Sequence, residues 1–203
     1  MYIPELFKNE NQLEIEQFLN ENGFAILVNQ TQGKIWGTHT PLFLEKQNDK
    51  FILSGHISRE NPQAESLKND EEILAIFNGP HTYISSSWYD HENVPTWNYI
   101  AVHVYGKIRL LDYDATIASL KKLVDKYEKK QENPIRVEAL SEKTLRQARG
   151  ILAFEIEITD IQAKKKLSQN RDPKNYETII TQLEKSSDNN DKQVAIEMRK
   201  NKP

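Results

Sequence analysis

The chain has 203 residues, with 27 lysines and arginines against 30 aspartates and glutamates. This length suits one domain with a single sizeable core, and the charge balance excludes a generally basic nucleic-acid coat. The absence of cysteine excludes disulfides, thiolate metal sites and cysteine nucleophiles. Neither a run of about 18 apolar residues nor a signal peptide is found, so we expect a cytoplasmic protein without a membrane span.

Charge is distributed unevenly along the chain. Residues 1–120 carry 8 basic and 16 acidic side chains, whereas residues 121–203 carry 19 basic and 14 acidic ones. The C-terminal part therefore has a net charge of +5, which suits an anionic partner such as DNA. The alternative is that these charges lie on ordinary solvated helix faces.

A helix is predicted near the N-terminus, over roughly residues 11–22. Leu13, Phe18 and Leu19 form its expected apolar face, and Gly23 follows where a helix C-cap is expected. Short strands come next, and Pro41 is expected to interrupt the second of them. Turns are predicted at residues 30–33, 48–50 and 78–80. A short helix is predicted over 58–67, and strands over 24–28, 35–44, 51–54, 73–77 and 82–86.

The second half begins with a clear alternation of apolar and polar residues over 100–111, which predicts a strand. Gly106 inside it indicates a bulge or a close approach of another segment. A helix follows over 114–130, with Asp114 as its expected N-cap. The remaining predicted elements are helices over 141–149, 175–183 and 192–200 and a strand over 151–158.

These elements predict an α+β fold that is mainly β. Six or more short strands with helices outside them fit a closed β-barrel with α additions. Strands and helices do not alternate regularly enough for a doubly wound parallel sheet. We expect residues 1–160 to form the barrel domain with inserted helices. Residues 161–203 are expected to form a basic helical segment packed on it.

The segment from Gly55 to Pro62 is a candidate anion-binding site. It follows a predicted strand and opens a predicted helix, and it contains Ser58, Arg59 and Asn61. Free N–H groups at the start of a helix and a forked guanidinium charge favour an anion. The alternative is an ordinary capped helix with Ser58 at the N-cap.

Aromatic and basic residues supply two further candidates. Trp88, Tyr89, Trp97 and Tyr99 are suited to stacking on a planar ligand, although a small aromatic core is the alternative. The basic run over residues 164–171 is suited to contact a phosphate or a ligand ring, although a solvated face is the alternative.

Common catalytic and metal motifs are absent from the sequence. The five histidines are scattered and form no His-Glu-x-x-His pair, so no metal site is predicted. The sequence has no P-loop, no Gly-x-Ser-x-Gly elbow and no Gly-x-Gly-x-x-Gly dinucleotide fingerprint.

Taken in order, these segments resemble the PaiB-type FMN-binding negative transcriptional regulators. The blocks Pro-Thr-Trp-Asn-Tyr over 95–99 and Lys-Leu-Ser-Gln-Asn-Arg over 166–171 are the most distinctive. A small departure is Ser86, where the family commonly has proline. The segments that carry the resemblance are residues 1–4, 38–42, 55–62, 76–85, 87–89, 94–99, 102–106 and 166–171.

The resemblance implies an FMN-binding split β-barrel with flanking helices and a helical C-terminal extension. It also implies a homodimer with flavin sites at the subunit interface. Cationic and hydrogen-bonding side chains suit the FMN phosphate, and for this end we predict His56, Ser58, Arg59 and Asn61. Flat walls and edge hydrogen bonds suit the isoalloxazine ring. For the ring we predict Thr38, His39, Trp97 and Asn98, completed by Lys166, Gln169 and Asn170.

The family is linked to repression of sporulation and degradative-enzyme genes, so the expected function is a dimeric flavin-binding regulator rather than an enzyme. The sequence shows no helix-turn-helix, and DNA binding through the positive C-terminal part is a hypothesis. One alternative is a small flavin-dependent oxidoreductase that uses NAD(P)H as a transient donor. Another is a haem-binding barrel with His39, His56, His81 or His103 as an axial ligand.

Overall fold

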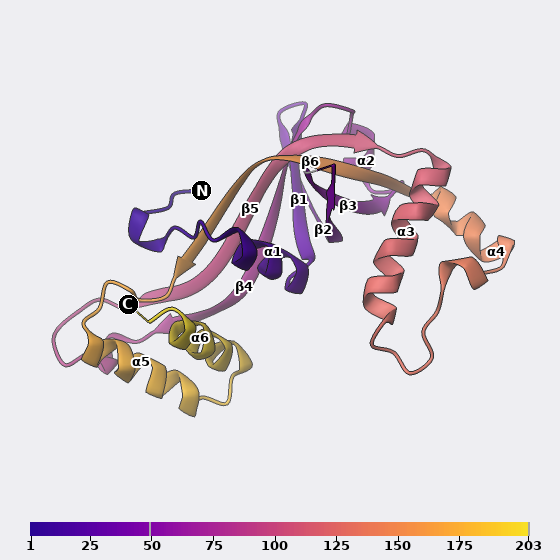
Figure 1. Ribbon diagram of the computed structural model, residues 1–203. Helices are drawn as coiled ribbons and strands as arrows, with labels where there is room; N and C mark the ends of the chain where they lie inside the picture. The colour runs from indigo at the N-terminus through magenta and orange to yellow at the C-terminus, as the bar shows by residue number, and fades with distance from the viewer. Residues whose placement is uncertain (49, 203) are drawn as a thin grey trace. The chain divides into compact units, whose positions relative to one another are not determined.

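The computed structural model describes residues 1–48 and 50–202 (Figure 1). Asp49, in a predicted turn, and Pro203, at the end of the predicted C-terminal segment, lie outside the described residues. The chain forms two compact units, and each contains segments from distant parts of the sequence. Unit 1 consists of Met1–Phe18, Asn78–Val102 and Gln162–Pro203, and unit 2 consists of Leu19–Phe77 and His103–Ile161.

Six strands form a closed barrel in the order β1-β2-β3-β6-β5-β4. The pairings of β1 with β2, β2 with β3, and β3 with β6 are antiparallel. β1 also pairs antiparallel with β4, where Ile26 lies opposite Ile76. The predicted barrel is therefore confirmed. The strands are β1 (Phe24–Thr31), β2 (Lys34–Gln47), β3 (Lys50–Ser58), β4 (Glu72–Ile84), β5 (Thr96–Leu110) and β6 (Ile151–Lys166).

The strands are longer than predicted, and two predicted interruptions are wrong. β2 continues through Pro41, where the amide of the next residue, Leu42, donates to the Gly23 carbonyl at 2.7 Å. A proline removes only its own donor, so a neighbouring amide can still keep a strand paired. β4 likewise continues through residues 78–80, and β6 runs to Lys166 instead of ending at residue 158.

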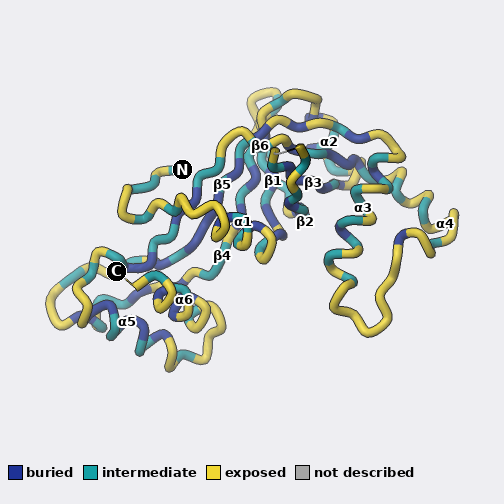
Figure 2. Tube along the Cα trace, in the orientation of Figure 1, coloured by how far each residue is buried: buried dark blue, intermediate teal, exposed yellow. Residues whose placement is uncertain are grey.

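The interior of unit 2 is formed by alternate residues of its strands (Figure 2). Leu27, Leu42 and Leu53 are fully buried there, as is Phe154. Gly106 confirms the predicted close approach, because a Cβ atom at this position would lie 2.6 Å from Ile156 Cγ2. Small residues at such positions let neighbouring strands pack at this distance.

The helices of unit 2 begin at residues other than those predicted. α2 (Pro62–Ser66) is capped by Asn61, whose side chain accepts from the Gln63 amide at 2.9 Å, and not by Ser58. α3 (Tyr113–Glu128) is capped by Asp112 in place of Asp114. The helix predicted over 141–149 divides in two. Its parts are α4 (Glu142–Leu145) and the 3-10 helix Arg146–Gly150; a further 3-10 turn is Val137–Ala139.

Unit 1 has a hydrophobic core of its own, to which α5 (Pro173–Lys185) and α6 (Asn189–Lys200) contribute. Tyr176 is buried in this core, and its hydroxyl donates to the Met198 carbonyl at 2.7 Å. Unit 1 also contains the 3-10 turns Glu5–Phe7 and Ser86–Trp88.

α1 (Gln12–Glu21) begins in unit 1 and confirms the predicted N-terminal helix. Of its predicted apolar face, Leu19 is buried and Phe18 packs against a hydrophobic core, but Leu13 is 77% exposed and Ile15 is buried in its place. Within residues 1–48 and 50–202, every helix is too short or too polar to cross a membrane.

Candidate functional site

The predicted site residues fall into two groups, one in each unit. The group in unit 2 lies on β2, on β3 and in the turn before α2, and it consists of Thr38, His39, His56, Ser58, Arg59 and Asn61. The group in unit 1 lies on β5, on β6 and in the turn after β6, and it consists of Trp97, Asn98, Lys166, Gln169 and Asn170.

In unit 2, Asn61 connects β2 to the start of α2. Its Nδ2 donates to Thr38 Oγ1 at 2.8 Å, and its Oδ1 accepts from the Gln63 amide at 2.9 Å. One side chain therefore fixes the end of the β3–α2 turn against the neighbouring strand. The structure thus brings two of the predicted site residues into direct contact.

His39, His56 and Ser58 lie on the outer face of the barrel. Leu42 and Gly55 are register partners that face the interior, and side chains alternate along each strand from there. Ser58 is exposed and His56 is half-buried. The exposed His39 ring stacks on Phe24, with 5.9 Å between the ring centroids. These residues thus present polar groups and a flat ring on one face.

Burial lowers the pKa of His56 below its ordinary value. The imidazole is therefore neutral at pH 7 and offers a hydrogen bond rather than a charge. Thr40 supports this part of β3 from the next strand, because its Oγ1 donates to the His56 carbonyl at 2.6 Å. The permanent positive charge in the unit 2 group therefore belongs to Arg59.

Arg59 is exposed at the end of β3, and its backbone and side chain are both fixed to the segment before β6. Its amide donates to the Gly150 carbonyl at 2.9 Å, and its Nε donates to the Arg149 carbonyl at 3.1 Å. Ser58 Oγ accepts from the Glu60 amide at 3.2 Å, which shapes the turn. The Arg59 side chain lines a pocket of about 470 Å³. The terminal nitrogens of this guanidinium fit a phosphate group, which needs cationic donors.

In unit 1, Asn98 is fully buried and positions the turn that follows β6. Its Oδ1 accepts from Ser168 Oγ at 3.0 Å, and its Nδ2 lies 3.5 Å from Met198 Sδ. Gln169 is also bonded within unit 1, because its side chain bridges the Leu167 amide and the Lys165 carbonyl at 2.7 and 2.6 Å. The side-chain amides of Asn98 and Gln169 therefore fix the turn that follows β6.

Lys166 lies beside the start of β5. Its Nζ donates to the Trp97 carbonyl at 2.7 Å and also to Thr96 Oγ1. Burial lowers the pKa of Lys166, and the nearby positive charges of Lys164 and Arg171 lower it further. The last member of this group, Asn170, is exposed in the turn after β6.

The aromatic residues of unit 1 divide between the core and the surface. Tyr89 is buried and Trp88 packs against the same core, as the core alternative for this stretch predicts. Trp97 is 54% exposed. With Tyr99 it lines an open pocket of about 390 Å³, together with His81.

Sequence reasoning missed the surroundings of Trp97. Tyr83 packs edge-on against the Trp97 ring with 6.0 Å between centroids, and His81 lies 6.4 Å away. Both come from β4, two residues apart. Alternation along a continuous strand would have placed them on one face, but the predicted break at 78–80 hid this signal.

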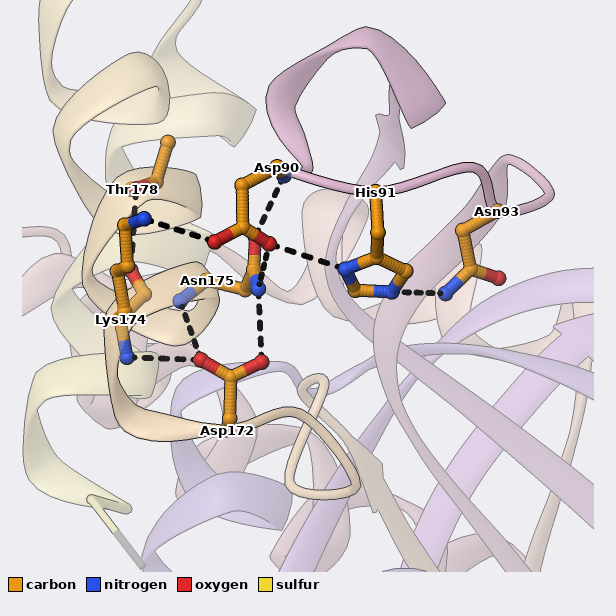
Figure 3. Close-up of polar contacts among 7 residues, drawn as sticks. All are labelled: Asp90, His91, Asn93, Asp172, Lys174, Asn175 and Thr178. Atoms are coloured by element: carbon orange, nitrogen blue, oxygen red, sulfur yellow. Dashed lines mark hydrogen bonds and ion pairs between the residues drawn. The ribbon is translucent and has the colours of Figure 1, made fainter.

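A polar network in unit 1 was also missed (Figure 3). Asp90 accepts from Lys174 Nζ and from Asn175 Nδ2, both at 2.8 Å, and its carboxylate lies 3.0 Å from His91 Nδ1. Asn175 also donates to Asp172, the N-cap of α5, at 2.7 Å. The network fastens the loop between β4 and β5 to the first turn of α5. No motif marks it, because its members are far apart in the sequence.

Among residues 1–48 and 50–202, no group of three or more histidine, aspartate or glutamate side chains is placed to hold a metal ion. At the end of β3, the backbone amides of Arg59, Glu60 and Asn61 are already bonded, to the Gly150 carbonyl, Ser58 Oγ and the Ser58 carbonyl. The donors left for a ligand are the terminal nitrogens of the Arg59 guanidinium, which suit an oxyanion.

Comparison with known proteins shows one family. Residues 1–160 match the family described as "Putative FMN-binding domain". The chain is 46% identical over 196 residues to "Protease synthase and sporulation protein PAI 2" of Bacillus subtilis (strain 168), covering 96% of this chain and 95% of that protein.

Two solved structures show the same fold at low sequence identity. The "FAD and Heme binding protein" of Mycobacterium smegmatis has a TM-score of 0.61 at 15% identity, covering 78% of this chain and 73% of that chain. The "Flavocytochrome Anf3" of Azotobacter vinelandii has a TM-score of 0.59 at 16% identity, covering 84% of this chain and 75% of that chain. At this identity the likeness concerns the fold alone.

Proposed function

This chain belongs to the PaiB-type family of FMN-binding domains, and from that premise we propose that it binds FMN and acts as a flavin-dependent regulatory protein. The relative over nearly the full length carries a name that refers to protease synthesis and sporulation. We propose a regulatory role of the same kind for this chain, in the cytoplasm. When bound, FMN supplies a ring that accepts and releases electrons.

One observation carries the proposal for the phosphate end. At the junction of β3 and α2, Arg59 has a permanent positive charge and lines a pocket, next to the exposed hydroxyl of Ser58. The FMN phosphate carries close to two negative charges, so a guanidinium and a hydroxyl suit it. His56, neutral on the same face of β3, is proposed to add a hydrogen bond without charge.

Asn61 is proposed to act by positioning rather than by contact with the ligand. Both ends of its side chain are already bonded, to Thr38 Oγ1 and to the Gln63 amide. It therefore holds Arg59 and Ser58 where β3 ends. Thr38 and His39 are proposed for the ring, because His39 presents an exposed flat face stacked on Phe24.

For the unit 1 group we make a separate proposal, which is that it contacts a planar ring. Trp97 offers an exposed indole face beside His81, which suits stacking on a planar ring. Lys166 holds the backbone of Trp97, and the buried Asn98 holds the turn that contains Gln169 and Asn170. We propose that Lys166, Asn98 and Gln169 position this surface, whereas the exposed Asn170 is free to meet a ligand edge.

We propose that the protein is a homodimer. Phe24 is 65% exposed and Ile35 is 71% exposed, and both come from the neighbouring strands β1 and β2. The register places them at opposite ends of the outer face of this hairpin, because Phe24 pairs with Pro41 and Ile35 with Gln30, and we propose that a second copy of the chain covers this face.

Direct binding of DNA is the weaker part of the regulatory proposal. Part of the positive charge of the C-terminal part is paired with carboxylates; in unit 1, Arg199 contacts Glu184 at 2.6 Å and Glu177 at 3.0 Å. Lys174 is paired with Asp90 at 2.8 Å. These pairs favour the alternative of solvated helix faces, so we place regulation at the flavin site.

The test is an absorption titration of the purified protein with FMN. We expect a saturable shift of the flavin bands with one FMN per chain. A spectrum that stays the sum of free flavin and protein at every ratio would contradict flavin binding and remove the basis of the proposed function.

A further inference from the structure

The pocket beside Arg59 contains a second arginine that the sequence does not single out. Its volume is about 470 Å³ and it lies within unit 2, between the end of β5, the first turn of α3 and the start of β6. The charged and aromatic residues that line it are Arg59, Asp112, Tyr113 and Arg149.

Both guanidinium groups are held in place by neighbouring residues. The Arg59 Nε donates to the Arg149 carbonyl at 3.1 Å, and this bond leaves the two terminal nitrogens of Arg59 for other acceptors. The Arg149 Cζ lies 5.7 Å from the centroid of the Tyr113 ring, a cation–π distance. The two guanidinium groups therefore line one pocket, and these contacts already restrict the conformational freedom of both side chains.

The pocket holds more positive than negative charge. Elsewhere in the chain, Arg109 pairs with Glu155 and Arg146 with Glu142. Over the described part of the chain, no ion pair is found for Arg59 or Arg149. Asp112 is the one acidic residue that lines the pocket, and its carboxylate accepts from the Ala115 amide at 2.9 Å as the cap of α3. Two guanidiniums against one engaged carboxylate favour an anionic ligand.

The pocket is continuous with the end of β3. Ser58 is the register partner of Ile151, and Ile151 lines the pocket. The Arg59 amide donates to the Gly150 carbonyl, which directly follows Arg149. Arg149 is thus placed beside the residues proposed for the FMN phosphate.

We propose that Arg149 is a second phosphate-binding residue, which acts with Arg59 on the phosphate of FMN. This inference rests on the proposed function. A phosphate monoester presents several acceptor oxygens and nearly two charges, which two guanidiniums match better than one. Tyr113 supports Arg149 through its ring.

The experiment compares FMN with riboflavin, which lacks the phosphate. Dissociation constants of both are measured by flavin fluorescence for the wild type, Arg149→Ala and Arg149→Gln. We expect the variants to bind FMN about tenfold more weakly, because an exposed charge-assisted hydrogen bond is lost. Riboflavin affinity is expected to stay unchanged. The glutamine variant keeps the Cβ–Cγ stem and a polar end of the side chain without the charge, so it serves where alanine impairs folding.

Arg146→Ala is the matched control. Arg146 lies on the same 3-10 helix, but it pairs with Glu142 at 3.5 Å and does not line the pocket. We expect its FMN affinity to equal that of the wild type.

Different results separate this inference from the proposed function. If the Arg149 variants bind FMN as the wild type does, or lose FMN and riboflavin equally, the role of Arg149 is overturned while flavin binding stands. The same conclusion follows if Arg146→Ala shows the same loss. If the wild type binds neither flavin, the proposed function fails, and this inference fails with it.

Discussion

Arg59 supplies the permanent positive charge of the unit 2 group. It is exposed, its Nε is bonded to the Arg149 carbonyl, and it lines the pocket at the end of β3. By contrast, Asn61 and Thr38 are bonded to each other, and His56 is neutral at pH 7 because burial lowers its pKa. At the scale of single residues, we therefore expect recognition of the FMN phosphate to depend most on the Arg59 charge.

Replacing Arg59 tests that dependence. We expect Arg59→Ala to weaken FMN binding by several-fold to a hundredfold, because a charge-assisted hydrogen bond is worth about 1.5–3 kcal/mol. Isothermal titration with FMN measures the effect. Arg59→Lys keeps the charge but loses the forked geometry of the guanidinium. We therefore expect its FMN affinity to lie between those of the wild type and Arg59→Ala. An unchanged FMN affinity in Arg59→Ala would remove Arg59 from the site.

The residue types of this site were predictable, but their individual roles were not. The pattern after Gly55 indicated an anion site, and the structure does place Ser58 and Arg59 at the end of a strand. The pattern did not show that Asn61, not Ser58, caps α2. It also did not show Arg149, which reaches the pocket only because Ser58 pairs with Ile151 in the register of β3 and β6. A register between distant strands leaves no local signal.

At the scale of elements, the prediction made from a glycine was correct, whereas the strand breaks predicted at proline-containing segments were wrong. Gly106 was predicted to mark a close approach, and the structure places Ile156 and the Glu157 backbone directly against it. Pro41 and the 78–80 segment were predicted to break strands, but both lie inside continuous ones. Local propensity predicted the breaks, and pairing with neighbouring strands overrode it.

Gly106→Ala tests the close approach. A Cβ atom there would lie 2.6 Å from Ile156 Cγ2 and closer still to the Glu157 carbonyl oxygen, so the backbones of the two strands have to separate. We expect the free energy of unfolding in urea to fall by about 1–3 kcal/mol, the usual cost of overpacking.

Gly37→Ala is the control, because the nearest atom to its added Cβ would be Ile26 Cγ2 at an ordinary 3.6 Å. Equal stability of the two variants would show that β5 and β6 do not pack as described.

The loop between β4 and β5 gives a prediction on pH. Hydrogen bonds from Lys174, Asn175 and His91, in that order, hold the pKa of Asp90 well below its usual range. A depressed carboxyl pKa stabilises the folded state above the unfolded pKa of about 3.9, and this stabilisation is lost as pH falls toward the folded value. We therefore expect Asp90→Asn to be less stable than the wild type at pH 7. The difference should shrink below about pH 4.

Urea unfolding at a series of pH values measures this difference. Asp125→Asn, on the exposed side of α3, is the control and is expected to show no such pH dependence. A stability difference for Asp90→Asn that stays constant from neutral to acidic pH would contradict a charged Asp90 as the centre of the network.

At the scale of the whole molecule, the sequence predicted the barrel and the family but not how charge is arranged. The net charge of +5 in the C-terminal part is a correct count. Yet Arg199 contacts Glu184 and Glu177, and Lys202 contacts Glu177 at 3.0 Å. Net charge along a sequence does not show which side chains pair in space. Arg59 and Arg149, for which no ion pair is found among the described residues, lie in unit 2.

The central claim is that this protein recognises FMN through its phosphate, and the wild-type protein can test it directly. The measurement is the ratio of the dissociation constants for riboflavin and FMN, determined by flavin fluorescence under the same conditions. Arginine contacts with a phosphate predict FMN binding at least about tenfold tighter than riboflavin binding. Equal affinity for the two flavins would contradict the account, because the pocket beside Arg59 would then make no contribution to flavin recognition.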